Sequence, residues 1–466
     1  MTDPRRTLPS VSALLESAGV RALLQSAPRA VVVDAVRRVI ESAREQGWAP
    51  PDIVWTKVIE GAVAHALRPS LRSVINATGI VLHTNLGRAP LAPAAIDAMA
   101  RVASGYSNLE FDLDVGARGS RYTHCAALLR ELTGAEDALV VNNCAAALVM
   151  SLNTVADGRD ALLSRGELVE IGGSFRVHDI MRKSGARLRE VGATNRTHLV
   201  DYTRAIDMRT AAILKVHRSN FAVQGFVTDV SVTDLAPAAR QRGIPVIHDL
   251  GSGLLISLDD IGLCGEPTAR DALRAGASIV VMSGDKLLGG PQCGLILGTA
   301  SHIAEMRQNP LARSYRVDKL TLAALEATLA LYRDPARAMR EIPTLALLGT
   351  PLDTLRARAT RGVDALRAAG VAAELVDTAS TVGAGAFPTT ELPSVAIALD
   401  GDANRWAAAL RRHEPAVVGR VHDGRMGLDV RAVPDESLDA LVAAVLFSRE
   451  PAHIVFVKSD NQIVPL

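Results

Sequence analysis

Two polar residues, each at the end of an apolar segment, carry the chemistry that is most readily read from the sequence. Asp249 follows the segment PVIH and opens DLGSG (249–253), and Lys286 follows ASIVVM within SGDKLLGGPQCG (283–294). A lysine between glycines at the end of a strand can be drawn into a cleft, where desolvation favours the neutral amine and lets it bond covalently to an aldehyde. Taken alone, Lys286 also fits a solvated surface turn, and Asp249 also fits a structural loop carboxylate.

The spacing of these two residues makes the pair more informative than either one. Lys286 follows Asp249 by 37 residues, which is about one β–α–β unit, so we expect the amine and the carboxylate on neighbouring strand ends. Pyridoxal phosphate requires this arrangement, because an aspartate keeps its pyridinium nitrogen protonated and a lysine holds its aldehyde. The pair therefore predicts a site for that cofactor.

A third segment predicts a cradle for the phosphate of the cofactor. The apolar segment ALVV is followed by Asn142, Asn143, Cys144 and Ala145, where a helix of small residues begins. The free N–H groups and the dipole at the start of such a helix bind phosphate, and small side chains let it approach the backbone. Ser283 is expected to add a hydroxyl group. The alternative interpretation of this segment is an ordinary asparagine helix cap.

The elements that must position these residues alternate between strands and helices from residue 71 onward. Over about 230 residues this alternation predicts an α/β fold, with a mostly parallel sheet and helices on both of its faces. In such sheets the ligand-binding groups follow the carboxyl ends of the strands. Helical periodicity before this region and a smaller α/β pattern after it predict three domains, at 1–70, 71–335 and 336–466.

Composition and charge exclude several classes of protein. The 466 residues, 48% hydrophobic and 22% charged, suffice for several globular domains. No apolar run reaches the ~20 residues of a membrane span, and no apolar signal segment follows the N-terminus, so we expect a cytoplasmic protein with no membrane partner. The formal net charge of +1 excludes a global polycation, and the 3% aromatic content argues against a base-stacking platform. The four cysteines lack zinc-binding spacing, so no metal site is predicted.

Longer segments of the chain resemble one family, the bacterial selenocysteine synthases, or L-seryl-tRNA(Sec) selenium transferases. The resemblance spans nearly the whole chain and is carried by NATGIVLHTNLGRAPL (76–91), YSNLEFDLDVGARGSRY (106–122), KVHRSNFAVQGF (215–226), DLGSG (249–253), SGDKLLGGPQCG (283–294) and NPLARSYRVDKLTLAALEATL (309–329). It implies a fold-type-I pyridoxal-phosphate enzyme. Such an enzyme converts seryl-tRNA(Sec) to selenocysteinyl-tRNA(Sec) by β-elimination of water and addition of selenium from selenophosphate. It further implies a homo-oligomer, a ring of dimers such as a homodecamer, with an N-terminal helical domain that binds tRNA.

The resemblance also assigns roles to individual residues. Lys286 matches the lysine that bonds to the cofactor aldehyde, and Asp249 falls where fold-type-I enzymes keep the partner of the pyridinium nitrogen. Arg88, Arg313 and Arg316 match the cluster that binds the phosphate group of selenophosphate. Two arginines three residues apart can converge on one anion, because each guanidinium forms a bidentate fork. The segment GARGSRY supplies further anion-binding candidates, Arg118 and Arg121.

At a few positions the chain departs from the pattern of the family. Cys144 lies in a segment that is usually NNNAAA-like, and Tyr315 lies in one that usually reads RALR. In the C-terminal domain, GAGAFP (383–388) replaces a GGGS-like loop. His83 and His217 lie in matching segments, where each can stack on the cofactor, assist acid–base chemistry or serve as a hydrogen-bonded structural histidine.

Two other functions compete with selenium transfer. One is a pyridoxal-phosphate lyase or ammonia-lyase that acts on a free amino acid or an amino-sugar derivative, for which the N-terminal helical domain has no use. The other is a tRNA-binding or assembly protein without catalysis, against which the presence of both Lys286 and Asp249 argues.

Overall fold

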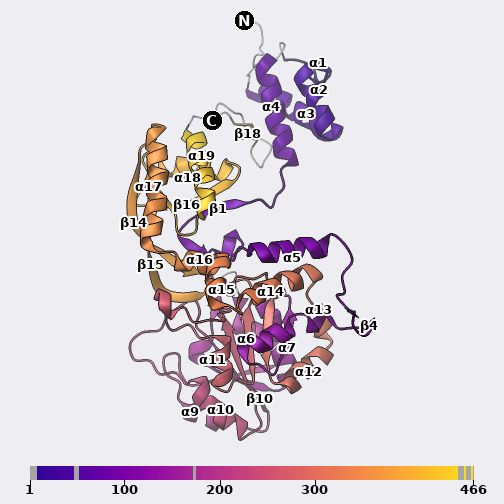
Figure 1. The fold of residues 1–466 in the computed structure, drawn as a ribbon, viewed down its shortest axis with the longest axis vertical. Helices are drawn as coiled ribbons and strands as arrows, with labels where there is room; N and C mark the ends of the chain where they lie inside the picture. The colour runs from indigo at the N-terminus through magenta and orange to yellow at the C-terminus, as the bar shows by residue number, and fades with distance from the viewer. Residues whose placement is uncertain (1–7, 47–51, 172–174, 450–455, 458–462, 465–466) are drawn as a thin grey trace.

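The computed structural model forms an N-terminal helical unit, a large α/β body and a smaller α/β unit, arranged as in Figure 1. Across the ranges that it describes, no helix combines the length and apolar character needed to cross a bilayer. The described residues are 8–46, 52–171, 175–449, 456–457 and 463–464.

The N-terminal helices enclose a hydrophobic core of their own. Val20, Val36 and Ile59 are fully buried there, and Trp55 is nearly so. This core explains the helical spacing of apolar residues in the first part of the chain. The unit lies at the top of Figure 1, beyond the smaller α/β unit. Its helices are α1 (Val11–Glu16), α2 (Ala18–Ser26), α3 (Arg29–Gln46) and α4 (Asp52–Leu67).

A seven-stranded sheet forms the centre of the large body. Its strand order is β5-β13-β12-β11-β10-β6-β9, and every strand runs parallel to the others except β13, which is antiparallel to both of its neighbours. The mostly parallel sheet predicted from the sequence is thus confirmed. The strands are β5 (Asp137–Val141), β6 (Asp160–Ser164), β9 (Arg187–Val191), β10 (Thr210–Val216), β11 (Val246–Gly251), β12 (Ile279–Ser283) and β13 (Gly294–Gly298).

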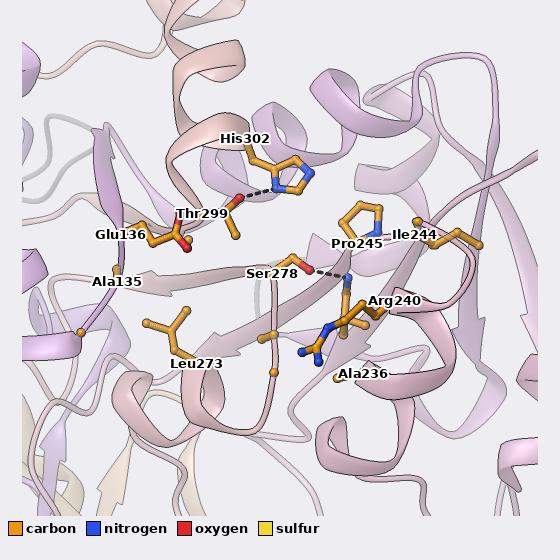
Figure 2. A pocket seen from close by; sticks show the side chains of 16 residues that line it. Ala135, Glu136, Ala236, Arg240, Ile244, Pro245, Leu273, Ser278, Thr299 and His302 are labelled. Atoms are coloured by element: carbon orange, nitrogen blue, oxygen red, sulfur yellow. Dashed lines mark hydrogen bonds between the residues drawn. The ribbon is translucent and has the colours of Figure 1, made fainter.

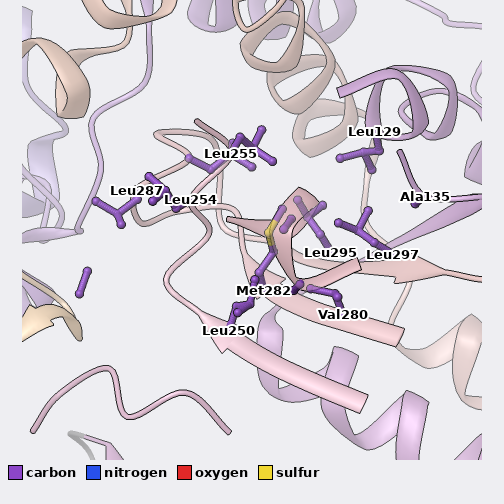
Figure 3. Close-up of a cluster of buried hydrophobic side chains, with 14 of the residues drawn as sticks. Leu129, Ala135, Leu250, Leu254, Leu255, Val280, Met282, Leu287, Leu295 and Leu297 are labelled. Atoms are coloured by element: carbon purple, nitrogen blue, oxygen red, sulfur yellow. The ribbon is translucent and has the colours of Figure 1, made fainter. Parts of the chain in front are cut away.

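Both faces of this sheet are buried, which accounts for the continuous apolar runs of its strands. Alternate residues of β12 point to opposite faces: Val280 and Met282 belong to one core, Ile279 and Val281 to the other. Figure 3 shows the first of these cores, where Met282 lies among leucines of neighbouring segments. The sheet therefore forms a rigid platform beneath the loops at its carboxyl edge.

Helices cover both faces of the sheet and extend from it toward the second unit. Leu148 of α7 and Met306 of α12 pack on one face, and Leu129 of α6 and Leu325 of α14 pack on the other. The helices of this body are α5 (Pro93–Ala103), α6 (Ala126–Thr133), α7 (Cys144–Ala156), α8 (Val177–Lys183), α9 (Leu199–Ala205), α10 (Val232–Arg240), α11 (Ala269–Arg274), α12 (Ala300–Gln308), α13 (Leu311–Ser314), α14 (Lys319–Leu331), α15 (Pro335–Glu341) and α16 (Pro343–Gly349).

A six-stranded sheet with the order β1-β16-β17-β15-β14-β2 forms the smaller unit. Helices α17, α18 and α19 pack on it around Leu355, Leu410 and Val445, all fully buried. Its elements are β1 (Val74–Ala77), β2 (Ile80–Leu82), α17 (Leu352–Ala368), β14 (Ala373–Gly383), β15 (Ala386–Leu399), α18 (Ala403–Arg412), β16 (Ala416–His422), β17 (Arg425–Asp429) and α19 (Leu438–Arg449).

The order of the strands in this smaller sheet differs from what the sequence pattern indicated. Strands β1 and β2 precede the large body in the chain yet pair with β16 and β14, so residues 74–82 share a sheet with residues 373–429. The segment GAGAFP contains the turn of a long β14–β15 hairpin. The division of the chain into three domains at residues 70 and 335 stays a prediction.

Three short hairpins complete the described fold. The hairpin of β3 and β4 projects from the right side of the large body in Figure 1. The hairpin strands are β3 (Phe111–Asp112), β4 (Ala117–Arg118), β7 (Glu170–Ile171), β8 (Phe175–Arg176), β18 (Phe456–Val457) and β19 (Ile463–Val464).

Candidate active site

Lys286 and Asp249 lie close together at the carboxyl edge of the seven-stranded sheet. Strands β11 and β12 are parallel neighbours, so the loops that follow them start side by side, as the 37-residue spacing predicted. A Cβ atom placed on Gly251 would lie 3.9 Å from both Asp249 Oδ1 and Lys286 Nζ. Asp249 is 7% exposed and Lys286 6% exposed. A carboxylate and an amine thus share one desolvated site, and their catalytic roles stay predictions.

Burial sets the electrostatics of this pair. It raises the pKa of Asp249 to about 6, although the charge of Lys286 and a hydrogen bond from Cys144 oppose the shift. The Lys286 amine forms no hydrogen bond or ion pair with any residue in the described part of the chain. An amine without a protein partner remains available to a ligand.

A second lysine of the same region is engaged elsewhere. Lys215 of β10 forms an ion pair with Glu167, whose side chain is 2% exposed. The other oxygen of Glu167 accepts a hydrogen bond from Val216 N at 2.9 Å. Because this carboxylate binds its ammonium group, Lys215 is a poor competitor of Lys286 for an aldehyde.

The predicted phosphate cradle is the N-terminus of α7. Asn143 caps the helix, because its Oδ1 accepts a hydrogen bond from Ala146 N at 2.8 Å. The N–H groups of Cys144 and Ala145 donate to no atom of the described protein. A Cβ atom on Gly294 would lie only 2.1 Å from Asn143 O, so the glycine allows β13 to lie against this turn. The asparagine cap was considered as an alternative to a phosphate cradle. The structure has the cap and, beside it, the free N–H groups that a cradle requires.

Cys144 and Asn142 connect this turn to its surroundings. The Cys144 thiol lies 3.7 Å from Asp249 Oδ1, and burial holds its pKa well above the ordinary range. Ser283, at the end of β12, is 6% exposed, and its hydroxyl group acts against the rise in the pKa of this thiol. On the other side, Asn142 N donates to Tyr315 O at 2.9 Å. The segment of Tyr315 is therefore held next to the cradle.

Arg88 lies beside Lys286, because it forms an ion pair with Asp285, the residue that precedes the lysine. Arg88 Nη1 donates to Asp285 Oδ2 at 2.7 Å, and Ala89 N donates to Asp285 O at 3.3 Å. The backbone of Arg88 is left-handed, with a φ of 63°, which is uncommon for a residue with a side chain. This strained turn directs the guanidinium to the rim of the Lys286 loop.

The other predicted anion-binding arginines lie around α13. Arg313 and Arg316 are exposed, and Arg316 Nη1 lies 3.9 Å from Glu110 Oε1. Among the described residues, no hydrogen bond or ion pair joins Arg88 to either of them. Arg121 binds the same Glu110 at 2.7 Å and donates to Val317 O at 2.8 Å, so it has a structural role.

These contacts lower the pKa of Glu110, chiefly through its hydrogen bond with Arg121 and also through Arg316 and Arg118. Arg118 itself is exposed on β4.

The two histidines differ from each other. His217 Nε2 lies 3.1 Å from Glu266 Oε1, and His217 N donates to Asp249 O at 2.8 Å. His83 Nδ1 is buried and has no hydrogen-bond partner among the described residues, which differs from the hydrogen-bonded role considered for it. Asp285 and Glu266 were not among the site residues predicted from the sequence. Asp285 was detectable as the neighbour of Lys286, whereas Glu266 has no local signal.

A cavity of about 440 Å³ lies at the opposite edge of the same sheet. Figure 2 shows it around Ser278, the residue before β12, with Arg240, Thr299 and His302 also in its lining. It shares no residue with the site of Lys286.

Comparisons with known proteins agree with this geometry. A profile of the family L-seryl-tRNA selenium transferase matches residues 74–434, and a profile of the selenocysteine synthase N-terminal region matches residues 5–44. The L-seryl-tRNA(Sec) selenium transferase of Geobacter metallireducens is 46% identical over 455 residues, which cover 94% of this chain and 98% of the relative. That of Solidesulfovibrio magneticus is 49% identical over 467 residues, which cover 95% and 97%.

Among solved structures, a D-glucosaminate-6-phosphate ammonia-lyase matches with a TM-score of 0.58 at 23% identity, over 83% of this chain and 97% of that one. A likeness at this identity shows the fold alone. The family matches confirm the resemblance seen in the sequence and, with it, the fold-type-I α/β class and the pyridoxal phosphate cofactor. The chain belongs to the L-seryl-tRNA selenium transferase family.

Proposed function

We propose that this chain transfers selenium to the serine carried by tRNA(Sec), with Lys286 and Asp249 as its catalytic residues. The relatives that it matches over nearly their whole length are L-seryl-tRNA(Sec) selenium transferases. The observation that carries the proposal is the buried amine and carboxylate of these two residues on neighbouring strand ends, beside the open N-terminus of α7.

The residues at this edge fit pyridoxal phosphate. Lys286 offers a buried amine without a protein partner, and Asp249 offers a carboxylate for the ring nitrogen. The free N–H groups of Cys144 and Ala145 suit a phosphate, because they add to the positive end of the helix dipole. Asn142, Asn143 and Ser283 border the same space. When bound, pyridoxal phosphate supplies an electrophilic aldehyde and an electron-accepting ring.

The side chains of the chain then have distinct tasks. Lys286 is placed to remove the proton from Cα of the seryl group, acting as general base. Its ammonium form can deliver a proton to the departing hydroxyl, which leaves as water. Asp249 keeps a negative charge at the ring nitrogen and so stabilises the positive charge there. The apolar platform beneath the site and the burial of both residues limit the access of competing water.

Arg88, Arg313 and Arg316 are assigned to selenophosphate. The contact of Arg88 with Asp285 supports this role, because it fixes a guanidinium next to Lys286. The hydrogen bond of Asn142 to Tyr315 O supports it for the other two, because it ties their turn to the cradle. Guanidinium groups bind phosphate through bidentate, charge-assisted hydrogen bonds.

The partners beyond the site form part of the same proposal. The N-terminal helical unit binds seryl-tRNA(Sec), which its match to a family N-terminal profile supports. The chain assembles as a homo-oligomer, a ring of dimers such as a homodecamer, in the cytoplasm. Exposed apolar side chains around the β3–β4 hairpin, Tyr106, Phe111, Leu113 and Val115, support assembly. Four cysteines without disulfides support a reducing compartment.

A direct assay tests the function. The purified full-length chain is incubated with seryl-tRNA(Sec) and selenophosphate, and selenocysteinyl-tRNA is measured after hydrolysis of the ester. Seryl-tRNA(Ser) and free serine are the controls. We expect product only from seryl-tRNA(Sec). Turnover of free serine alone would instead establish the lyase alternative.

A further inference from the structure

Glu266 is a buried carboxylate that touches two parts of the active-site rim. Its side chain is 3% exposed, and Oε1 lies 3.1 Å from His217 Nε2. Its other oxygen, Oε2, accepts a hydrogen bond from Phe387 N at 3.3 Å. Oε1 and the histidine Nε2 are both buried and face each other, and neither has a hydrogen-bond partner in the described part of the chain. The carboxylate of Glu266 thus connects His217, whose backbone bonds to Asp249, to the turn of the β14–β15 hairpin.

That turn has a backbone that needs outside support. Gly383, Ala384, Gly385 and Phe387 all have positive φ angles, of 83°, 46°, 71° and 49°. For a residue with a side chain, this conformation is strained, so it persists where neighbouring contacts enforce it. Ala384 and Phe387 adopt this conformation although they lack the conformational freedom of glycine. Contacts with the large body are therefore expected to hold the turn in place.

The large body supplies these contacts at two points besides Glu266. Phe387 is 5% exposed and packs into the core shown in part in Figure 3, although its strand belongs to the smaller sheet. A Cβ atom on Gly385 would lie 3.0 Å from Ser219 Oγ, so the turn abuts the segment that follows His217. Ser219 N in turn donates to His217 O at 2.9 Å.

We propose that Glu266 is a positioning residue for selenium transfer: it orients the His217 ring beside Asp249 and fastens the β14–β15 turn to the rim of the site. The inference rests on the proposed assignment of Lys286 and Asp249. Its physical basis is that a buried carboxylate is stabilised by partners that donate to it. The backbone of His217 is already fixed by its bond to Asp249 O, so the contact of its Nε2 with Glu266 decides how the ring is turned.

Two substitutions separate the two tasks of Glu266. Glu266→Gln keeps an oxygen that accepts from Phe387 N but removes the negative charge that faces His217. Glu266→Ala removes both. His217→Gln removes the imidazole and leaves the contact of Glu266 with Phe387. Glu391→Gln, an exposed glutamate on the same hairpin, is the matched control.

Hydrogen–deuterium exchange of residues 383–387 is the first measurement, on the full chain with and without pyridoxal phosphate. We expect exchange about tenfold or more faster in Glu266→Ala, as for loss of a hydrogen bond to a charged group. Exchange in Glu266→Gln, His217→Gln and the control should stay within about threefold of the wild type. Wild-type exchange in Glu266→Ala would overturn the role of Glu266 in fastening the turn.

Steady-state kinetics with seryl-tRNA(Sec) and selenophosphate form the second measurement. We expect kcat to fall about tenfold or more in Glu266→Gln and in His217→Gln, with a smaller change in KM for the tRNA, and no change in the control. An unchanged kcat in Glu266→Gln would overturn the orienting role. If Glu266→Ala does not fold, Glu266→Gln and His217→Gln still decide the orienting role. Because exchange is measured without cofactor as well, a wild-type chain that transfers no selenium would refute the proposed function separately.

Discussion

Cys144 Sγ lies 3.7 Å from Asp249 Oδ1, which joins the first residue of α7 to the carboxylate at the end of β11. Burial, and next the negative charge of Asp249, raise the pKa of this thiol well above its ordinary range. The thiol therefore stays protonated at neutral pH and donates a hydrogen bond to the carboxylate. In this way Cys144 favours the ionised form of Asp249.

Substitution of Cys144 should therefore shift the titration of the site. In Cys144→Ala the carboxylate of Asp249 loses a hydrogen-bond donor, so we expect its pKa to rise further. As the pH is lowered, the variant should then lose activity at a higher pH than the wild type does. Cys144→Ser retains a donor and should follow the wild-type profile closely. The measurement is the pH dependence of kcat/KM and of the absorbance of the bound cofactor. Identical profiles for all three proteins would show that the thiol does not influence Asp249.

Asp249 is expected to reduce the stability of the cofactor-free protein at neutral pH. Burial raises its pKa to about 6, so the folded state holds its proton where the unfolded state has lost it. Stability then falls as pH rises from the ordinary aspartate value through pH 6, by up to about 3 kcal/mol at pH 7. Below the ordinary aspartate pKa, the folded and unfolded states both hold the proton, so Asp249 no longer changes the stability.

Asp249→Asn removes this penalty, because the amide carries no charge. We expect a higher Tm for the cofactor-free variant at pH 7–8, little change at pH 4, and loss of most selenium transfer. Thermal unfolding across this pH range checks the sign. A variant that is less stable than the wild type at pH 8 would contradict the assignment of a charged, desolvated carboxylate to this position.

Lys286→Ala should abolish the covalent attachment of the cofactor while leaving the fold intact. The lysine lies at the end of β12 without an ion-pair partner among the described residues, so its loss removes no native contact of that kind. Borohydride reduction followed by peptide mapping should label Lys286 in the wild type and no residue in the variant. Lys183→Ala, an exposed lysine of α8, is the control. Label on Lys215 in the variant would move the cofactor to β10, despite the ion pair with Glu167.

The sequence alone was sufficient to predict the parallel sheet and the meeting of Lys286 with Asp249. Both follow from local rules, because apolar strands alternate with helices and parallel strands deliver their ends to one edge. Contacts between distant segments could not be predicted in this way. Glu266 meets Phe387 across 121 residues, and β1 pairs with β16 across most of the chain. Such pairs depend on how the two units pack, which leaves no periodic signal in either segment.

The two arginines of α13 and its following turn should act in the second half of the reaction. Loss of the seryl hydroxyl requires the cofactor and Lys286, whereas addition of selenium also requires a bound selenophosphate anion. Arg313→Ala and Arg316→Ala should therefore still eliminate water from seryl-tRNA(Sec). Loss of one charge-assisted contact costs roughly 1.5–3 kcal/mol, so the selenophosphate requirement should rise about ten- to a hundred-fold.

Separate assays of the two halves test this prediction. Release of tritium from Cα of labelled seryl-tRNA(Sec) reports the first half, and a selenophosphate titration of selenocysteinyl-tRNA formation reports the second. Arg340→Ala, an exposed arginine of α15, should leave both unchanged. Arg316→Ala also removes a contact of Glu110 at 3.9 Å, although Arg121 still binds that carboxylate. The double variant Glu110→Gln, Arg316→Ala controls for this change at Glu110. If both single variants lose the two halves equally, these arginines bind the cofactor phosphate or the tRNA acceptor end instead.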